Sequence, residues 1–215
     1  LLGEAGYDAG AVELLVHGTT LATNAILQRR HAKTGMLATA GFRDVLEIGR
    51  QRRPAFYNLD VSKPEPPVTR DCIHEIAGRL DETGTEVAPL DEAAVRMAVA
   101  ALREAGVEAI AICFMHAYAN PAHEEAARAV VREMWPDVFV CTSTDVLREF
   151  REFERFASAS VNASLLPVID RYLERFSVGL GEIDVRTAPL VMQSNGGSVS
   201  VSTVRKAPIN TFLSG

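Results

Sequence analysis

A histidine, a glycine and two threonines follow one another directly after a short apolar run. The stretch reads His17-Gly18-Thr19-Thr20, and Leu14-Leu15-Val16 precedes it. We expect a buried strand that ends in a turn and opens a helix through Arg30, because free N–H groups and the positive dipole end at a helix start suit an anion. A purely structural interpretation stays open, in which Thr19 or Thr20 caps the helix and Gly18 supplies backbone freedom.

A second turn of similar chemistry follows the apolar stretch Pro189–Gln193. Its residues are Ser194-Asn195-Gly196-Gly197-Ser198, and its N–H groups and amide suit a phosphate or carbonyl oxygen. Such residues also make ordinary turns. If both stretches end strands of one sheet, their turns face one crevice at the carboxyl ends of those strands.

Single side chains in polar stretches are the remaining candidates for chemistry. His17 is placed to orient a substrate or exchange a proton near neutral pH, although a structural hydrogen bond would explain it equally. Arg50, Arg52 and Arg53 follow Gly49 and are suited to an anionic substrate. The charged run 148–155 is typical of a solvated helix face.

Metal and disulfide chemistry are not indicated. None of the five histidines has a partner at the i, i+4 spacing that places two imidazoles on one zinc ion. The three cysteines are odd in number and lie in apolar, strand-like segments. We therefore expect no metal site, and thiols that are buried and reduced.

Composition narrows the class of protein. With 215 residues, 47% of them hydrophobic and 23% charged, the chain has the composition of a globular protein. The net charge of −6 and the lack of a long basic run argue against a nucleic-acid surface. The longest uncharged apolar run, Ala109–Met115, is too short to span a bilayer. We expect a cytoplasmic protein whose partners are small molecules or other proteins.

The periodicity predicts an α/β fold. Asp91 caps a helix that Gly106 ends, 107–114 reads as a central strand, and Asn120-Pro121 opens a second helix before a strand at 138–141. A β-hairpin is expected between residues 72 and 87. The order strand 12–16, helix 19–30, strand 35–39 predicts parallel neighbours. Two helices, 148–163 and 165–176, are expected to meet at Leu165 or Leu166, before Pro167.

Several motifs together resemble the hydantoinase A / 5-oxoprolinase family. They include the stretch from His17 through Asn24 and Ala25, the run Gly41–Gln51, and Lys63-Pro64-Glu65-Pro66. Further matches are 117–124, Glu149–Arg155 and 192–197, in the order in which the family has them. The resemblance covers nearly the whole chain.

This resemblance implies an actin-like, ribonuclease-H-type ATPase fold with a mixed sheet and flanking helices. It implies an α/β domain over 1–145, followed by a helical connection and the start of a second ATPase-like domain over 146–215. It also implies an enzyme subunit that uses ATP and Mg²⁺ to phosphorylate the carbonyl oxygen of a cyclic amide such as N-methylhydantoin or 5-oxoproline, together with a B-type subunit or domain. A subunit of an acetone or acetophenone carboxylase is the alternative, and a non-catalytic metabolite-binding module is another.

The site residues that follow are of three kinds. Catalytic roles are expected for His17, Thr19, Thr20 and Asn195; substrate binding for Asn24, Arg50 and Arg53; and nucleotide binding for Gly196, Gly197, Ser214 and Gly215. The last two begin a glycine loop of the family. Since the family's upstream phosphate loop, of the Asp-x-Gly-Gly-Thr type, would precede Leu1, we expect a piece of a longer polypeptide that by itself binds ATP weakly or not at all. Whether it forms a homo-oligomer is left open.

Overall fold

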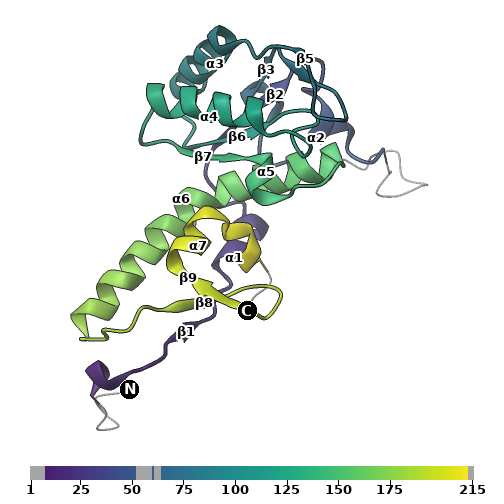
Figure 1. The fold of residues 1–215 in the computed structure, drawn as a ribbon. Coiled ribbons are helices and arrows are strands. Elements are labelled where there is room, and N and C mark those ends of the chain that lie inside the picture. Colours follow the sequence, from purple (N-terminus) through teal and green to yellow (C-terminus); the bar gives the residue numbers. More distant parts are fainter. Residues whose placement is uncertain (1–7, 52–59, 61–63, 213–215) are drawn as a thin grey trace. The chain divides into compact units, whose positions relative to one another are not determined.

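Parallel strands dominate the larger of the two compact units into which the chain divides (Figure 1). The computed structural model describes residues 8–51, 60 and 64–212. Unit 2 comprises Ala32–Ser164, and unit 1 comprises Leu1–His31 together with Leu165–Gly215. The boundaries between these units, at residues 31/32 and 164/165, differ from the expected division at residue 145. A functional domain that begins at residue 146 stays a prediction.

Unit 2 contains a four-stranded sheet in the order β3-β2-β6-β7, and all three of its pairings are parallel. The strands are β2 (Thr34–Thr39), β3 (Ile73–Ile76), β6 (Ala109–Cys113) and β7 (Phe139–Thr142). Every residue of β2 and β6 is buried, as expected of central strands covered on both faces. Figure 1 shows α3 (Glu92–Glu104) and α4 (Ala122–Met134) on one side of this sheet and α5 (Ser143–Val146) on the other.

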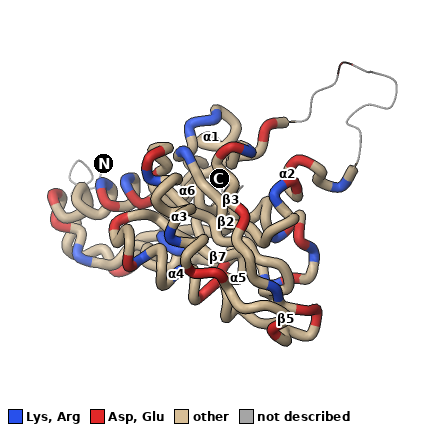
Figure 2. The backbone as a smooth tube through the Cα atoms, turned by 90° about the horizontal axis from the view of Figure 1, so that it is seen from above, with Lys and Arg blue, Asp and Glu red and all other residues tan. Residues whose placement is uncertain are grey.

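Helices α3 and α4 begin and end within one or two residues of the predicted positions. The Asp91 carboxylate accepts the N–H of Ala94 at the start of α3, and Gly106 follows the helix with a φ of 70°. Asn120 accepts the N–H of Ala122, and α4 begins one residue after Pro121. Blue and red residues are interspersed along α3 and α4 in Figure 2, so these helices present mixed charge.

Short elements complete unit 2. They are α2 (Val45–Ile48), η2 (Arg70–Cys72) and the antiparallel pair β4 (Arg79–Leu80) and β5 (Glu86–Ala88). The predicted hairpin is confirmed for β4 and β5, and Gly84 has the positive φ, 87°, that its turn requires. Residues 73–76 instead form β3, which pairs with β2.

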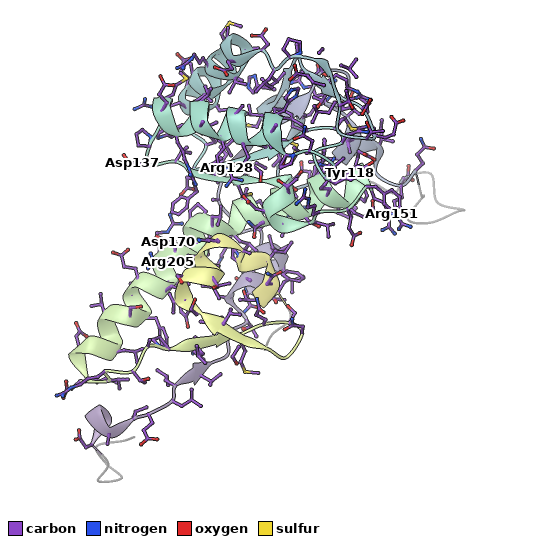
Figure 3. All side chains as sticks on the ribbon, in the orientation of Figure 1. Tyr118, Arg128, Asp137, Arg151, Asp170 and Arg205 are labelled. Atoms are coloured by element: carbon purple, nitrogen blue, oxygen red, sulfur yellow. The ribbon has the colours of Figure 1, made fainter. Side chains whose placement is uncertain are left out.

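Unit 1 contains a three-stranded sheet in the order β1-β8-β9. Strand β1 (Val16–His17) runs parallel to β8 (Leu190–Met192), which forms an antiparallel hairpin with β9 (Ser198–Ser200). The other elements of this unit are η1 (Ala9–Ala11), α1 (Leu21–Leu27), α7 (Val201–Lys206), η3 (Pro208–Thr211) and the later part of α6 (Glu152–Glu182). An ion pair of 2.8 Å between Asp170 and Arg205 ties α6 to α7 (Figure 3).

Two expectations about topology are wrong. Strand β1 pairs with β8 and β2 lies in the other sheet, so the segment 12–39 is not a βαβ unit with neighbouring strands. The expected break at Leu165 or Leu166 is absent, because α6 runs without interruption through Pro167. Leu165 is 0% and Leu166 4% exposed, and burying two leucines contributes about 3–6 kcal/mol, which offsets the roughly 3 kcal/mol cost of a proline inside a helix.

Candidate functional site

The two predicted turns leave the sheet of unit 1 at the same edge. Because β1 and β8 are parallel neighbours, with His17 opposite Val191, the segments that follow them both start at the carboxyl ends of the strands. Gly18, Thr20 and residues 194–197 are exposed. The structure therefore brings the two turns to one edge, where the sequence placed a crevice.

The His17 ring is held by the face of α6. Its Nε2 lies 2.5 Å from the Tyr172 hydroxyl, and its ring stacks on Phe176 with centroids 4.4 Å apart. Burial lowers the pKa of His17, because the charged imidazolium loses hydration. The structural hydrogen bond considered for this histidine is thus present, and a neutral imidazole with Nε2 engaged is the form that this geometry favours.

The threonines after Gly18 make local contacts at the start of α1. The Thr19 hydroxyl accepts the N–H of Leu21 at 3.2 Å, and the Thr20 hydroxyl accepts the Asn24 side-chain amide at 3.2 Å. Thr20 occupies the N-cap position, but its side chain caps no backbone N–H. Thr19 therefore provides the capping contact, while Thr20 and Asn24 form an exposed pair one helical turn apart.

The Ser194–Gly197 turn is the connection of the β8–β9 hairpin. Gly196 has a φ of 84° and donates to the Gln193 carbonyl, and Gly197 donates to the Asn195 side-chain oxygen at 2.9 Å. Both glycine N–H groups are thus used within the hairpin. A phosphate at this turn requires their release, and the nucleotide-binding role of Gly196 and Gly197 stays a prediction.

A small polar hollow of about 220 Å³ lies beside this turn, and Ser194 and Asn195 contribute to it with Gln193, Ile209 and Asn210. Ser194 is fully engaged, since its N–H and hydroxyl donate to the Asn210 carbonyl and its hydroxyl also contacts the Phe212 carbonyl. Asn195 is exposed, and within the described part of the chain its NH₂ group has no recorded acceptor. Asn195 is therefore a side chain at this hollow with donors available to a ligand, and the side-chain amides of Gln193 and Asn210 line the same hollow.

The predicted substrate arginine lies in unit 2. Arg50 follows α2, and its guanidinium binds Glu154 through Nε at 2.6 Å and Nη2 at 2.5 Å. The carboxylate's hydrogen bond with its own backbone N–H lowers the pKa of Glu154, and Arg50 lowers it further. Arg53, Ser214 and Gly215 lie outside the described residues.

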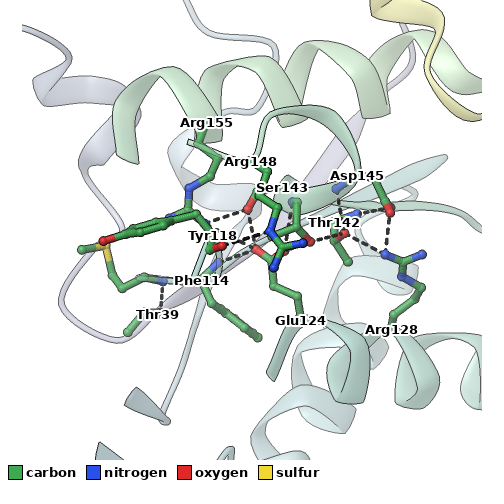
Figure 4. A network of polar contacts seen from close by, with 12 residues as sticks. Thr39, Phe114, Tyr118, Glu124, Arg128, Thr142, Ser143, Asp145, Arg148 and Arg155 are labelled. Atoms are coloured by element: carbon green, nitrogen blue, oxygen red, sulfur yellow. Dashed lines mark hydrogen bonds and ion pairs between the residues drawn. The ribbon is translucent and has the colours of Figure 1, made fainter. Parts of the chain in front are cut away.

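A buried polar cluster closes the carboxyl edge of the four-stranded sheet (Figure 4). Glu124 is 0% exposed and accepts the N–H of Phe114, the hydroxyl of Ser143, and both the N–H and the hydroxyl of Thr144 at 2.5–3.1 Å. The Arg155 guanidinium, also 0% exposed, donates to Ser143 and lies 4.0 Å from Glu124. Burial raises the pKa of Glu124, while these donors and Arg155 favour its ionised form.

This cluster corrects the interpretation of the run 148–155 as a solvated helix face. Arg155 is fully buried and supports the fold, and Glu154 is the partner of Arg50. Local sequence held no signal for either contact, since their partners lie 12–104 residues away in the chain. The same holds for Tyr172 and His17, which are 155 residues apart.

Cysteine and metal chemistry receive no support from the described residues. Cys72, Cys113 and Cys141 are buried free thiols, and burial raises the pKa of Cys141 to about 12. In residues 8–51, 60 and 64–212, no group of three or more His, Cys, Asp or Glu side chains is placed to hold a metal. No helix of that same part of the chain is long and apolar enough to cross a membrane.

The family model for the hydantoinase/oxoprolinase N-terminal region matches residues 1–135, and the hydantoinase/oxoprolinase model matches residues 155–215. The chain belongs to the hydantoinase/oxoprolinase family. Caprolactamase subunit alpha of Pseudomonas jessenii is 38% identical over 205 residues, which are 94% of this chain and 30% of that subunit. The 5-oxoprolinase of Saccharomyces cerevisiae is 32% identical over 217 residues, 89% of this chain and 17% of the yeast protein.

Two solved structures confirm the fold class. The crystal structure of ATP-dependent caprolactamase from Pseudomonas jessenii superposes with a TM-score of 0.89 at 37% identity, over 96% of this chain and 30% of that chain. Nucleotide-free acetone carboxylase superposes with a TM-score of 0.83 at 25% identity, over 99% and 32%. The expected actin-like ATPase fold, with a mixed sheet and flanking helices, is confirmed. The chain spans less than a third of each of these relatives.

Proposed function

We propose that the full-length protein is an ATP-dependent hydrolase that opens a cyclic amide. The observation that carries this proposal is the likeness to ATP-dependent caprolactamase, which extends over 96% of the chain at 37% identity. Acetone carboxylase matches the same region at 25% identity, so a carboxylase is the less supported alternative. N-methylhydantoin, 5-oxoproline and simple lactams are the substrates to compare.

The chemistry requires activation of a poor leaving group. ATP supplies a phosphoryl group for the amide carbonyl oxygen, and Mg²⁺ would neutralise phosphate charge. The donors of the Gly196–Gly197 turn are already used within the hairpin, so no step is assigned to a nucleotide at that turn. Ser214 and Gly215 are proposed to contribute to nucleotide binding on the resemblance alone.

The residues at the carboxyl edge of the unit 1 sheet are proposed to handle the reacting groups. Asn195 supplies amide donors for an oxygen that gains negative charge. His17, held by Tyr172 with a lowered pKa, is a neutral imidazole suited to proton exchange near neutral pH. Thr19, Thr20 and Asn24 orient the bound molecule, and Arg50 and Arg53 bind substrate.

A partner and a compartment accompany this proposal. The relative from Pseudomonas jessenii is named as subunit alpha, which supports a second subunit, and we assign that role to a hydantoinase B-type subunit or domain. Three buried free thiols and the use of ATP fit the cytoplasm.

The test is ATP hydrolysis by the purified full-length protein with its partner. ε-Caprolactam, 5-oxoproline, N-methylhydantoin and acetone with bicarbonate are supplied separately, and ADP and ring-opened product are measured together. We expect at least one cyclic amide to stimulate ADP formation in step with ring opening. Stimulation by acetone alone would establish the carboxylase alternative, and no stimulation by any compound would establish a non-catalytic module.

A further inference from the structure

Side-chain amides are concentrated at the polar hollow of about 220 Å³ in unit 1. Three of its five lining residues, Gln193, Asn195 and Asn210, carry a carboxamide, and the other two are Ser194 and Ile209. None of the five is ionisable. A phosphate is usually bound by cations, a helix N-terminus or free backbone N–H groups, so this lining suits an uncharged polar group better.

The volume of the hollow limits what can enter it. It is smaller than the roughly 300–1,000 Å³ of sites that enclose a drug-sized molecule. It is about seven times the roughly 30 Å³ that one water molecule occupies in the liquid. The hollow therefore accommodates one polar edge of a small ligand, with the rest of the ligand outside it.

Hydrogen bonds fix the backbone on both sides of the hollow. In the β8–β9 hairpin, the N–H of Gln193 donates to the Gly197 carbonyl at 2.7 Å, and its carbonyl accepts the N–H of Gly196 at 3.0 Å. On the η3 side, the Asn210 carbonyl accepts both the N–H and the hydroxyl of Ser194 at 2.8 Å. Ser194 thus ties the two segments together, and the positions of their side chains are preorganised.

The three carboxamides differ in the groups that they keep for a ligand. Asn195 uses its Oδ1 to accept the N–H of Gly197 and keeps only its NH₂ donors. Gln193 turns its Oε1 toward its own hairpin, 3.9 Å from where a Cβ on Gly197 would lie. Asn210 is exposed, and its side chain forms no hydrogen bond within the part of the chain that the structure describes. Asn210 therefore offers both an acceptor and donors from the η3 side.

A cyclic amide has an edge that such a carboxamide complements. A small ring holds the amide in the cis form, so that its N–H and C=O lie on the same edge, whereas in a trans peptide bond they point in opposite directions. A carboxamide side chain also presents a donor and an acceptor side by side, and the two groups can join through two parallel hydrogen bonds. A ketone or a lactam methylated on nitrogen cannot form both bonds.

We propose that Asn210 determines specificity by pairing with this edge of the substrate. Its side-chain oxygen accepts the ring N–H and its NH₂ group donates to the carbonyl oxygen, to which Asn195 donates from the hairpin side. The reacting oxygen thus lies at the same edge of the unit 1 sheet as the other residues proposed to act on it. This inference rests on the proposed function, because it assigns a residue to the substrate of that reaction.

The first test removes the carboxamide and keeps most of its volume. In the full-length protein with its partner, kcat/KM is compared for a cyclic amide that the protein uses and for its derivative methylated on the ring nitrogen, for example ε-caprolactam and N-methyl-ε-caprolactam. Asn210→Leu should reduce the preference for the N–H form at least about tenfold, with the KM for ATP unchanged. Gln28→Leu, which removes an exposed carboxamide of unit 1 that does not line the hollow, should leave the preference unaltered.

The second test keeps the acceptor and removes the donors. Asn210→Asp has nearly the same shape and retains an oxygen for the ring N–H, so the preference for the N–H form should stay within about twofold of the wild-type value, while the KM for the cyclic amide rises about tenfold. A purely structural role would not separate the two variants in this way. With turnover intact, a preference that is unchanged in Asn210→Leu, or that falls equally in Asn210→Asp, overturns the inference and leaves the proposed function standing.

Direct binding separates this inference from the proposed function. If no cyclic amide stimulates ATP hydrolysis, the proposed function fails, and saturation-transfer NMR of the full-length protein with ε-caprolactam and its N-methyl derivative then decides about the hollow. A signal that is stronger for ε-caprolactam and that Asn210→Leu abolishes supports recognition of the amide edge. No signal, or equal signals from the two compounds, overturns it.

Discussion

The carboxyl ends of β6 and β7 in unit 2 differ in their polar contacts from those of β1 and β8 in unit 1. In unit 2, the segments after β6 and β7 are tied to the buried Glu124 through the Phe114 N–H and the Ser143 hydroxyl, and Arg155 is sealed with them. In unit 1, the segments after β1 and β8 end in exposed turns at Gly18 and Asn195. The Glu124 carboxylate at the first edge is fully engaged by buried donors, while Asn195 at the second keeps donors for a ligand.

This difference teaches that a polar side chain at a strand end is no sufficient sign of a site. Glu124, on α4, reaches the ends of β6 and β7 and is fully buried among four donors, whereas Asn195, which follows β8, lies beside an open hollow. Changes at the unit 2 edge should therefore cost stability, and changes at the unit 1 edge should cost activity.

The largest expected effect is on stability. Glu124→Leu leaves Arg155 buried without its counter-charge and four donors without an acceptor, and we expect the free energy of unfolding to fall by about 3–5 kcal/mol. Urea unfolding followed by the fluorescence of Trp135, the single tryptophan, measures it. Glu133→Leu removes the exposed partner of Arg96 and should cost less than about 1 kcal/mol. Equal losses of unfolding free energy in the two variants would show that the buried cluster around Glu124 stabilises the fold no more than an exposed ion pair does.

The next effect is on catalysis at the unit 1 edge. Asn195→Ala removes the amide donors beside the hollow, and we expect amide-stimulated ATP turnover in the full-length protein to fall about 10²-fold with an unchanged urea midpoint. Ser198→Ala, on the adjoining strand β9, is the control. Turnover at the wild-type level in Asn195→Ala would show that Asn195 has no role in catalysis.

Two glycines sharpen the comparison at the level of the backbone. A Cβ on Gly35, in β2, would lie 2.5 Å from the Leu102 side chain, which is 0% exposed, so Gly35→Ala should destabilise unit 2 by about 1–3 kcal/mol through overpacking. Gly196→Ala meets open space but a φ of 84°, and should cost about 1–2 kcal/mol from backbone strain. Chemical unfolding measures both, and a substantially larger loss for Gly196→Ala would contradict this assignment of packing and strain.

The smallest expected effect is on the dependence of stability on pH. Burial lowers the pKa of His17, so the folded protein binds its proton less readily than the unfolded chain does. The free energy of unfolding should therefore be highest above the ordinary histidine pKa and fall as the pH drops through it toward the lowered value. His74, whose pKa burial also lowers, contributes with the same sign from unit 2. Below pH 6.5, His17→Gln should reduce the slope of the free energy of unfolding against pH, and His74→Gln should reduce the part of that slope that is left. An unchanged slope in both variants would contradict the attribution of this pH dependence to the two histidines.

Local patterns predicted most of the individual elements. The Asp91 cap and Gly106 bound α3, the Gly84 turn closes β4 against β5, and the apolar run 107–114 contains the buried strand β6. Each of these signals lies within a few residues of the element that it defines, because capping, turn conformation and side-chain periodicity are local properties of the chain.

Pairing and burial were decided only by tertiary structure. Strand β1 pairs with β8, 174 positions away, and a two-residue strand carries too little pattern to choose between partners. Helix α6 continues through Pro167 because two buried leucines outweigh the local preference for a break.

The candidate residues divide in the same way. The sequence by itself determined the turn residues His17–Thr20 and Asn195–Gly197, since strand, glycine and hydroxyl follow one another locally, and its motifs determined the family. Tertiary structure decided which polar groups are engaged: Tyr172 holds His17, Glu154 neutralises Arg50, and Arg155 is buried against Ser143 and Glu124. These partners lie up to 155 residues apart in the sequence. Burial changes the strength of each contact by lowering the local dielectric constant, and this burial exists only once the chain has folded.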